Sequence, residues 1–352
     1  MFSERGGCLS SGAVLADPCG QGVIARRVSV KAALFVLSLV VSLALGLPVG
    51  VVQAQSWPSR PLRLLVFTPA GGAPDISARV LAERLSPVLG QPVVVETRLG
   101  ANGNIAAEVV AHAPPDGHTL LLCADSQLVI NPHVYARMPY EPQDLVPLAT
   151  VASNEFFLVA NPAQPFRTFR EFIDQARSAN PPLAYASGGN GSQHQLTMEM
   201  LKARTGINLM HVPYKGAAPA TTAVIAGEVP VEFAGSTAGP QVRAGKLRGL
   251  AIAGPRRLAA FPDLPTISEF IPGFVNSIWL GVCGPRNLPE PIVERLRAEL
   301  NRLLVQPEVR EAFSRSGALE PLVTTREELA ALVKRDYEKY GQVVRTLGIK
   351  TD

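Results

Sequence analysis

Short apolar runs alternate with amphipathic segments along most of this chain, which is the pattern of an α/β protein. The first apolar run covers residues 62–67, and apolar residues then recur every three or four positions until Gly90, as on one face of a helix. Residues 119–124 are almost continuously apolar, as expected of a strand covered on both faces. The alternation of strand and helix signals predicts mostly parallel sheets with right-handed crossovers.

The same pattern divides the rest of the chain into strands and helices. A threonine and a glutamate three positions apart, at 168 and 171 and again at 325 and 328, have the spacing of a capping box and mark two helix starts. Further strands are predicted at 92–96, 148–152, 156–159, 183–186, 211–213, 229–233, 247–253 and 276–283. Helices are predicted at 105–113, 168–178, 217–226, 308–316 and 325–347, with others that Gly206 ends and that Pro289 opens.

Glycine-rich bends follow the strands predicted at 62–67 and 183–186. Gly71 and Gly72 precede the first helix, and the bend at 187–192 repeats the construction in the second half of the chain. Backbone N–H groups at a helix start have no intrahelical partner and lie at the positive end of the helix dipole, so they favour an anion. The alternative is a set of tight turns without a ligand. Side chains at the bends and strand ends add further donors: Ser126, Ser187, Asn190, Ser192, Ser236 and Thr237.

Motifs of catalysis, metal binding and nucleotide binding do not occur in the sequence. The five histidines are scattered and there is no Cys-x-x-Cys, so we expect no metal site. The bend at 188–191 lacks the third glycine of a dinucleotide fingerprint. Residues 235–239 are similar to a nucleophile elbow, but Thr237 holds the nucleophile position and no triad order is readable. We therefore expect a reversible binding site without a cofactor or catalytic residue, and a hydrolase or transferase is the rival interpretation.

The first 54 residues have the pattern of a secretory signal peptide. Basic residues at 26, 27 and 31 precede an apolar segment at 32–47, and small residues at 52–54 predict cleavage after Ala54. A retained membrane anchor is the alternative, although Pro48 and Gly50 interrupt the apolar segment. We expect export to the periplasm by the general secretory route, because the twin-arginine pattern at 25–31 is incomplete.

Charge and cysteine content narrow the choice of partners and leave one question open. The formal net charge is +4, and no basic run or aromatic–basic interleaving points to nucleic acid. Beyond residue 54 the only cysteines are Cys123 and Cys283, both in apolar runs. They either form a disulfide in an oxidising compartment or remain buried thiols. The length of the chain favours two domains or lobes.

Ordered motifs along residues 56–350 resemble one family, the periplasmic solute-binding receptors of tripartite tricarboxylate transporters, also called the Bordetella uptake gene family. The matching segments are Trp57–Pro61, Gly71-Gly72-x-x-Asp75, Glu96–Asn104, Pro115–Leu120, Asn131-Pro132, Tyr185–Ser192, His211–Gly216 and Pro262–Thr266. Their order and spacing cover nearly all of the chain after the predicted leader.

The resemblance implies a two-lobed periplasmic binding protein fold with a hinged, type II-like cleft, in which each lobe is a mostly parallel sheet flanked by helices. The first lobe would comprise 56–153 with 276–352, and the second 154–275. It also implies a monomer without enzymatic activity or a cofactor, which binds a small carboxylate and delivers it to membrane transporter subunits. A ligand sensor for a separate signalling partner is the alternative function.

In this family the ligand carboxylate is held by the loop after the first strand and by the bend of the second lobe. Carried over to this sequence, the resemblance implies a ligand site made of two such segments and of two further strand ends. The implied residues are Ala70, Gly71, Gly72, Ala73 and Asp75, then Ser187, Asn190, Gly191 and Ser192, completed by Ser126, Ser236 and Thr237.

Some positions depart from the family pattern or admit two interpretations. Many members have Phe-Asp after the last strand of the second lobe, whereas this chain has Phe233-Ala234. Loss of that carboxylate removes a partner for an ammonium group and disfavours amino-acid ligands. Asp75 either contacts the ligand or caps its own helix. His194 either faces the anion or lies at the surface, and Trp279 is either core or cleft wall.

Overall fold

Two mixed β-sheets flanked by helices form the part of the chain that the computed structural model describes, residues 57–315 and 319–350. The six-stranded sheet has the order β11-β4-β10-β3-β1-β2. Its strands are β1 (Leu62–Val66), β2 (Val93–Thr97), β3 (Thr119–Ala124), β4 (Leu145–Glu155), β10 (Ser277–Pro285) and β11 (Leu319–Pro321). The predicted signal peptide, 1–54, lies outside the described residues.

The five-stranded sheet has the order β7-β6-β8-β5-β9. Its strands are β5 (Phe157–Ala160), β6 (Leu183–Ser187), β7 (Leu209–Pro213), β8 (Val231–Ala234) and β9 (Arg248–Ile252). The α-helices are α2 (Ala73–Leu89), α3 (Asn104–Ala111), α4 (Asn131–Val134), α5 (Phe169–Ser178), α6 (Gln193–Thr205), α7 (Ala217–Ala226), α8 (Gly239–Arg243), α9 (Glu290–Leu304), α10 (Pro307–Arg315) and α11 (Arg326–Leu347). Short 3-10 or π turns lie at Ala101–Gly103, Ser126–Ile130, Pro142–Asp144, Ser236–Ala238 and Ile267–Glu269.

Parallel and antiparallel pairs share each sheet, which is more mixed than the expected mostly parallel arrangement. β1 pairs in parallel with β2 and β3, whereas β10 runs antiparallel between β3 and β4. In the second sheet β6 pairs in parallel with β7 and β8, and β5 runs antiparallel to β8 and β9. The α/β class and the two-lobed fold are confirmed, but an apolar run does not reveal its direction in a sheet.

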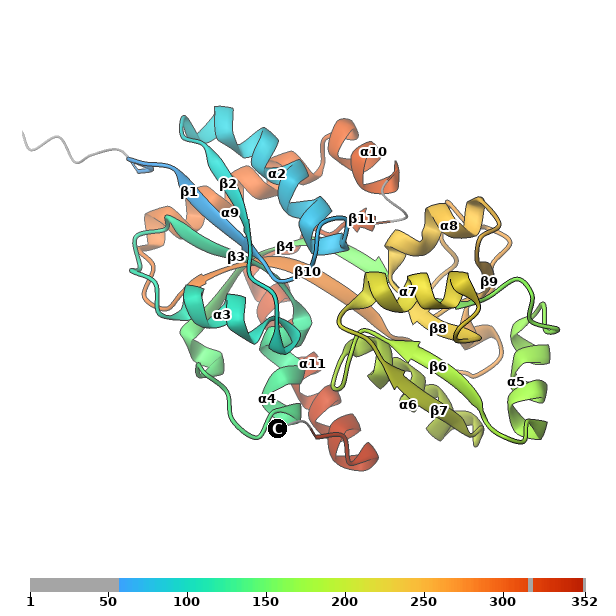
Figure 1. Cartoon of the computed structure of the whole chain (residues 1–352). Helices are drawn as coiled ribbons and strands as arrows, with labels where there is room; N and C mark the ends of the chain where they lie inside the picture. The colour runs from blue at the N-terminus through green and yellow to red at the C-terminus, as the bar shows by residue number, and fades with distance from the viewer. Residues whose placement is uncertain (1–56, 316–318, 351–352) are drawn as a thin grey trace, which may run out of the picture. The chain divides into compact units, whose positions relative to one another are not determined.

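Side-chain alternation along the strands explains how helices cover both faces (Figure 1). In β1, Leu64 packs with α2 and α9 in one apolar cluster, while its neighbour Leu65 packs with α3 and α11 in another. In the second sheet, Leu158 joins the cluster that includes α5 and α6, and Val159 joins the cluster that includes α7. Every residue of β3 is buried, as its continuous apolar run predicted.

The opening strand–loop–helix unit follows its sequence signals closely. Pro74 lies in the first turn of α2, where its missing N–H costs no hydrogen bond. Gly90 ends the helix with φ of 71°, a left-handed conformation that favours glycine. The capping residues Thr168 and Thr325 also accept the predicted bonds, from the N–H groups of Glu171 and Glu328.

A disulfide joins Cys123 and Cys283, so the pairing left open by the sequence occurs in this structure. The two Cα atoms are 6.2 Å apart on the neighbouring strands β3 and β10, and both side chains are fully buried.

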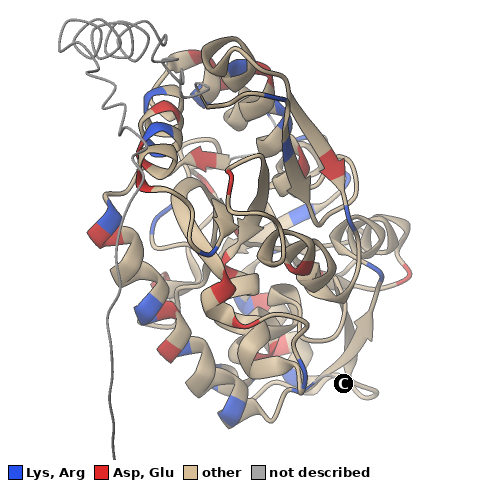
Figure 2. Cartoon of the chain, turned by 90° about the vertical axis from the view of Figure 1, so that its left-hand side faces the viewer, with Lys and Arg blue, Asp and Glu red and all other residues tan. Residues whose placement is uncertain are grey.

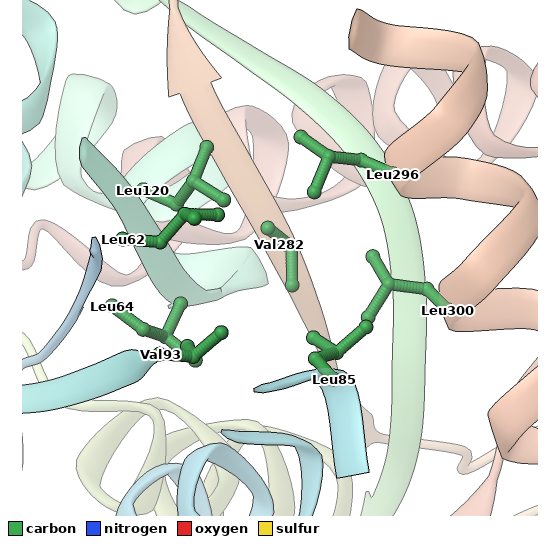
Figure 3. A pocket seen from close by; sticks show the side chains of 8 residues that line it. All are labelled: Leu62, Leu64, Leu85, Val93, Leu120, Val282, Leu296 and Leu300. Atoms are coloured by element: carbon green, nitrogen blue, oxygen red, sulfur yellow. The ribbon is translucent and has the colours of Figure 1, made fainter. Parts of the chain in front are cut away.

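An apolar cavity of about 10 Å³ lies on the face of the six-stranded sheet that α2 and α9 cover (Figure 3). Its size corresponds to one water molecule at most, and its lining offers that water no polar partner. The cavity is therefore a packing gap remote from the strand-end loops. It is lined by Leu62, Leu64, Leu85, Val93, Leu120, Val282, Leu296 and Leu300.

The chain passes between the two sheets at neighbouring points that are hydrogen-bonded to each other. The N–H of Ala253 donates to the carbonyl of Phe156 at 2.8 Å, and the N–H of Asn276 donates to the carbonyl of Ala253 at 2.8 Å. The buried carboxyl of Glu155 accepts from the hydroxyl of Ser277 across the same crossing. In the described part of the chain, no helix is both long enough and apolar enough to span a membrane.

Candidate functional site

The carboxyl ends of β1, β2 and β3 bring three loops of the six-stranded sheet together. β1 pairs in parallel with both other strands, so the loops that follow the three strands leave the sheet at the same edge. Gln127 connects two of the loops: its Nε2 donates to the carbonyl of Asn102 at 2.8 Å and to Oγ of Ser126 at 3.1 Å. Its Oε1 accepts from the N–H of Ala124 at 2.8 Å. We did not predict these contacts of Gln127 from the sequence, because they depend on the packing of segments that are distant along the chain.

Asp75 holds the first loop in shape. Its buried carboxylate accepts from the N–H of Gly71 at 3.0 Å and from Nε of Arg79 at 3.0 Å. Gly71 has φ of 85°, which a side chain would strain. Both carboxylate oxygens therefore have partners within the chain. The carboxylate bonds to the loop before α2 and to Arg79 on its own helix, whereas α2 has no side-chain cap.

The start of α2 keeps other donors available. The N–H groups of Ala73 and Asp75 lie in the first helical turn, where the helix provides no acceptor. Ala70 is exposed, and Gly72 precedes the helix as an extended N-cap without a side-chain bond. The hydroxyl of Thr68 is buried and has no hydrogen-bond partner within the described chain.

The second sheet repeats this arrangement at the ends of β6, β7 and β8. The N–H of Gly191 donates to Oε1 of Gln195 at 2.7 Å, and Oγ of Ser192 donates to the carbonyl of Gly189 at 2.7 Å. Ser192 is also the N-cap of α6, because its Oγ accepts from the N–H of Gln195. Asn190 is exposed at the tip of the bend. These bonds fix the conformation of the loop.

Ser187 and His211 form a close pair that the sequence did not predict. Oγ of Ser187 lies 2.6 Å from Nε2 of His211, and Nδ1 of His211 lies 3.3 Å from Nε2 of Gln195. Because Oε1 of Gln195 accepts from Gly191, its amide nitrogen donates to Nδ1, which places the histidine proton on Nε2. That proton points at the serine, so His211 does not act as a general base for Ser187. The pair holds the loop.

Ser236 follows β8 and meets the strand that crosses from the other sheet. Its N–H donates to Oδ1 of Asn154 at 2.8 Å, while its fully buried hydroxyl has no hydrogen-bond partner within the described chain. Thr237 is half-buried beside it in the short turn that leads into α8. Although this segment resembles a nucleophile elbow, no histidine within the described residues forms a hydrogen bond with the Ser236 hydroxyl.

His194 lies in the first turn of α6, with its ring against Phe156. The ring centroids are 5.2 Å apart, and Nδ1 is buried without a hydrogen-bond partner within the described residues. Burial lowers the pKa of His194 to about 4, so the imidazole is neutral at physiological pH. His194 as a whole is partly buried, with its ring packed against Phe156.

A contact between Asp125 and Gln193 links the two sets of loops. Asp125 follows β3, Gln193 opens α6, and Nε2 of Gln193 donates to Oδ1 of Asp125. Ser126 and Ser192 are their sequence neighbours, so this contact brings predicted residues from both sheets close together. Trp279 belongs to the core, where it is 4% exposed and its Nε1 donates to Asp336 at 3.1 Å.

Five buried side-chain atoms without a hydrogen-bond partner lie at these strand-end loops and at the first turn of α6, and six more lie elsewhere in the described chain. Such atoms are uncommon in folded proteins and call for an explanation, such as a ligand or an ordered water. At the loops they are Oγ1 of Thr68, Oδ2 of Asp125, Oε1 of Gln193, Nδ1 of His194 and Oγ of Ser236.

Many charged side chains form ion pairs with one another on the helices, away from the strand-end loops. Figure 2 shows basic and acidic residues interspersed over the helices in that view, where no large patch of one sign stands out. Arg326 pairs with Glu290 at 2.7 Å, and Arg302 pairs with Glu299 at 2.9 Å. Among the described residues, no three histidine, cysteine or acidic side chains are grouped as metal ligands. The loops thus offer dipoles, hydroxyls and a neutral imidazole.

The chain matches known proteins along most of its length. The model of the family described as the tripartite tricarboxylate transporter family receptor matches residues 77–349. BugT of Bordetella pertussis is 35% identical over 303 residues, which cover 85% of this chain and 93% of that protein.

Two solved structures with bound ligands have a similar fold. The structure of R. palustris Rpa4515 with adipate has a TM-score of 0.78 and 31% identity, and covers 84% of this chain and 99% of that chain. The structure of MatC from Rhodopseudomonas palustris with bound malate has a TM-score of 0.73 and 31% identity, and covers 82% of this chain and 100% of that chain. This chain therefore belongs to the family of tripartite tricarboxylate transporter receptors, which are periplasmic solute-binding proteins and not enzymes.

Proposed function

We propose that this receptor captures a small carboxylate, most favourably a dicarboxylate of four to six carbons, between the strand-end loops of its two sheets. The observation that carries the proposal is that the hydroxyls of Thr68 and Ser236, one at a strand end of each sheet, are buried and have no hydrogen-bond partner within the described chain. A carboxylate accepts several hydrogen bonds, so it suits the hydroxyls of Thr68 and Ser236 and the N–H groups at the start of α2. The similar structures with adipate and malate support the same ligand class.

The proposed site joins segments from two lobes, 56–153 with 276–352 and 154–275. Its first half consists of Ala70, Gly71, Gly72, Ala73, Asp75 and Ser126. Its second half consists of Ser187, Asn190, Gly191, Ser192, Ser236 and Thr237. Within this set we propose two roles, the shaping of the loops and the donation of hydrogen bonds to the ligand. Asp75, Ser187 and Ser192 bond to their own loops and shape them, whereas Ser236 has a hydroxyl to donate.

Cleft closure provides the mechanism. A ligand that bonds to both halves stabilises the closed state by its differential affinity for that state. The closed, monomeric receptor would then deliver the carboxylate to the membrane subunits of a tripartite transporter. Binding by neutral donors has a further advantage, because a carboxylate held without a buried cation can be released without breaking an ion pair.

A thermal-shift screen tests this function. The protein, produced from its full chain and exported, is unfolded and refolded to remove carried-over ligand, and is then mixed with adipate, malate, citrate, aromatic carboxylates, acidic amino acids or nicotinate. At about 100 times Kd, a ligand that binds only the folded state adds roughly 2.7 kcal/mol of stability. For a protein of this size the melting temperature rises on the order of several degrees.

The outcome with variants separates specific binding from a general salt effect. Ser236→Ala removes one unpartnered donor and is expected to reduce the shift, whereas Ser178→Ala, at the end of the distant helix α5, is the matched control. Mass spectrometry of the recovered ligand should find it unchanged. No shift with any carboxylate from a folded protein, or conversion of the ligand to a product, would contradict the proposed function.

A further inference from the structure

Asp125 and Gln193 meet at the place where the two halves of the proposed site approach each other. Asp125 directly follows β3 and is fully buried, and Gln193 is the first residue of α6 and is 5% exposed. Nε2 of Gln193 donates to Oδ1 of Asp125. Ser126 and Ser192, the sequence neighbours of this pair, are proposed ligand-binding residues. The distance between Asp125 and Gln193 therefore affects the distance between the two halves of the ligand site.

The two side-chain oxygens of the pair that take no part in this bond indicate that the carboxyl group of Asp125 is neutral. Oδ2 of Asp125 and Oε1 of Gln193 are both buried, and neither has a hydrogen-bond partner within the described chain. Both atoms are acceptors if the carboxyl group is ionised, and a buried acceptor without a donor is costly. A protonated carboxyl group and a primary amide are complementary instead. The amide N–H donates to one carboxyl oxygen, and the O–H on the other oxygen donates to the amide oxygen.

The groups that face Asp125 favour the protonated form. Burial raises the pKa of Asp125 well above its usual range, and the negative charge of Asp336 on α11 raises it further. Lys339 on α11, the N–H of Ser126 and the amide of Gln193 act in the opposite direction. The Lys339 ammonium, however, donates to Oδ1 of Asn276 at 3.1 Å, and burial lowers its own pKa.

A second interaction holds α6 in place next to the pair. Nδ2 of Asn276 donates to Oγ1 of Thr197, one helical turn beyond Gln193, at 2.7 Å. The hydroxyl of Tyr340 on α11 donates to Oδ1 of the same asparagine at 2.8 Å. The first two turns of α6 are thus fastened to β3 and to α11, so a change in the acid–amide pair would be transmitted to Ser192.

We propose that Asp125 and Gln193 form a neutral acid–amide pair that positions the two halves of the carboxylate site, and that ligand binding weakens in alkaline solution as this pair is lost. The inference rests on the proposed function. Asp125 and Gln193 are positioning residues, since they act through the neighbouring loops. Ionisation of Asp125 would leave the amide oxygen facing a carboxylate, which separates the halves that the ligand must bridge.

The test is the dissociation constant for adipate and for malate as a function of pH, over a range in which both ligand carboxylates remain ionised. The wild-type protein is expected to lose about tenfold in affinity as Asp125 ionises, the scale of one buried hydrogen bond left unmade. Asp125→Asn retains one donor and one acceptor for Gln193 at every pH, so its affinity should be high and independent of pH. Gln193→Ala should bind weakly across the whole range.

Asp336→Asn is the matched control, because it removes a neighbouring negative charge and keeps the pair. Its loss of affinity should persist but begin at a lower pH, since the ionised form of Asp125 is then repelled less. A residue with a merely structural role would produce neither this shift nor the pH-independent binding of Asp125→Asn. If Asp125→Asn follows the same pH profile as the wild-type protein, the inference is overturned.

A measurement without ligand separates this inference from the proposed function. The melting temperature of Asp125→Asn should exceed that of the wild-type protein by a margin that widens as the pH rises. In the wild-type protein the folded chain keeps a proton on Asp125 that the unfolded chain releases, so its stability falls with pH, whereas asparagine does not titrate. A constant difference in melting temperature contradicts the acid–amide pair even if no carboxylate binds. Normal carboxylate binding with a pH profile independent of Asp125 overturns the inference alone.

Discussion

Glu232 gives the fold a predictable sensitivity to alkaline pH. It lies in the middle of β8, where its neighbours across the sheet are Val159 and Ala186, and it is 0% exposed. Strand alternation places it on the same face as Ala234, towards the apolar cluster that includes α7. Burial raises the pKa of Glu232 from 4.5 to about 8, and the hydroxyl of Thr221 offsets part of this effect.

The sign and size of the effect follow from proton binding. Between pH 4.5 and about 8 the unfolded chain has released this proton and the folded chain still binds it, so the free energy of unfolding falls as the pH rises. A pKa difference of roughly 3.5 units, at 1.36 kcal/mol per unit, corresponds to about 5 kcal/mol. Local rearrangement that hydrates the ionised carboxylate would reduce this value, which is therefore an upper bound.

Glu232→Gln removes the titration and nearly preserves the shape of the side chain. In urea unfolding, the variant and the wild-type protein should have free energies of unfolding within about 1 kcal/mol at pH 5, because both side chains are neutral in the folded protein and pH 5 lies close to the unfolded pKa of the glutamate. At pH 8 the variant should be more stable by several kcal/mol. Glu228→Gln, an exposed substitution in the loop before β8, should leave the pH dependence unchanged. Parallel curves for Glu232→Gln and the wild-type protein would refute the reasoning.

Three further predictions concern other parts of the fold. As the pH falls from 6.5 to about 4, the wild-type protein should lose up to about 3 kcal/mol of its free energy of unfolding in urea, because only the unfolded chain binds a proton at His194 in this range. His194→Gln should remove this loss, and an unchanged pH dependence between pH 6.5 and 4 would contradict the prediction. Asp75→Ala should weaken adipate binding in calorimetry about tenfold by releasing the loop at Gly71, whereas unaltered affinity would show that the loop needs no such support. Replacing Cys123 and Cys283 by alanine opens a loop of 160 residues and should cost about 5 kcal/mol in urea unfolding, or close to nothing if the thiols are unpaired.

Local features of the fold were predictable from the sequence because short-range physics determines them. Gly90 and Gly206 end their helices in left-handed conformations, and Thr168 and Thr325 cap theirs, since each feature involves only a few neighbouring residues. The first strand, its loop and the helix after it were predicted for the same reason. The antiparallel insertion of β10 between β3 and β4 was not, because strand direction depends on where the chain returns after more than a hundred residues.

The loops of the proposed site were inferred from the sequence, whereas the contacts that join these loops were not. Hydroxyls and glycines at strand ends pointed to Ser192 and Ser236 because parallel strands present their carboxyl ends at one edge. The link from Gln127 to Asn102, like the pair of Asp125 and Gln193, joins residues that only the tertiary fold brings together. No residue spacing in the sequence could have indicated these contacts.

The central claim is that the strand-end loops bind a carboxylate through hydrogen-bond donors. Titration calorimetry of the refolded protein with adipate, or with whichever diacid gives the largest thermal shift, tests it most directly when the dimethyl ester of the same acid is the control. The account predicts saturable binding of the diacid and affinity for the ester that is lower by about a hundredfold, because the donors favour a charged acceptor. Equal affinity for the acid and the ester, or no binding of any diacid by the folded protein, would contradict it.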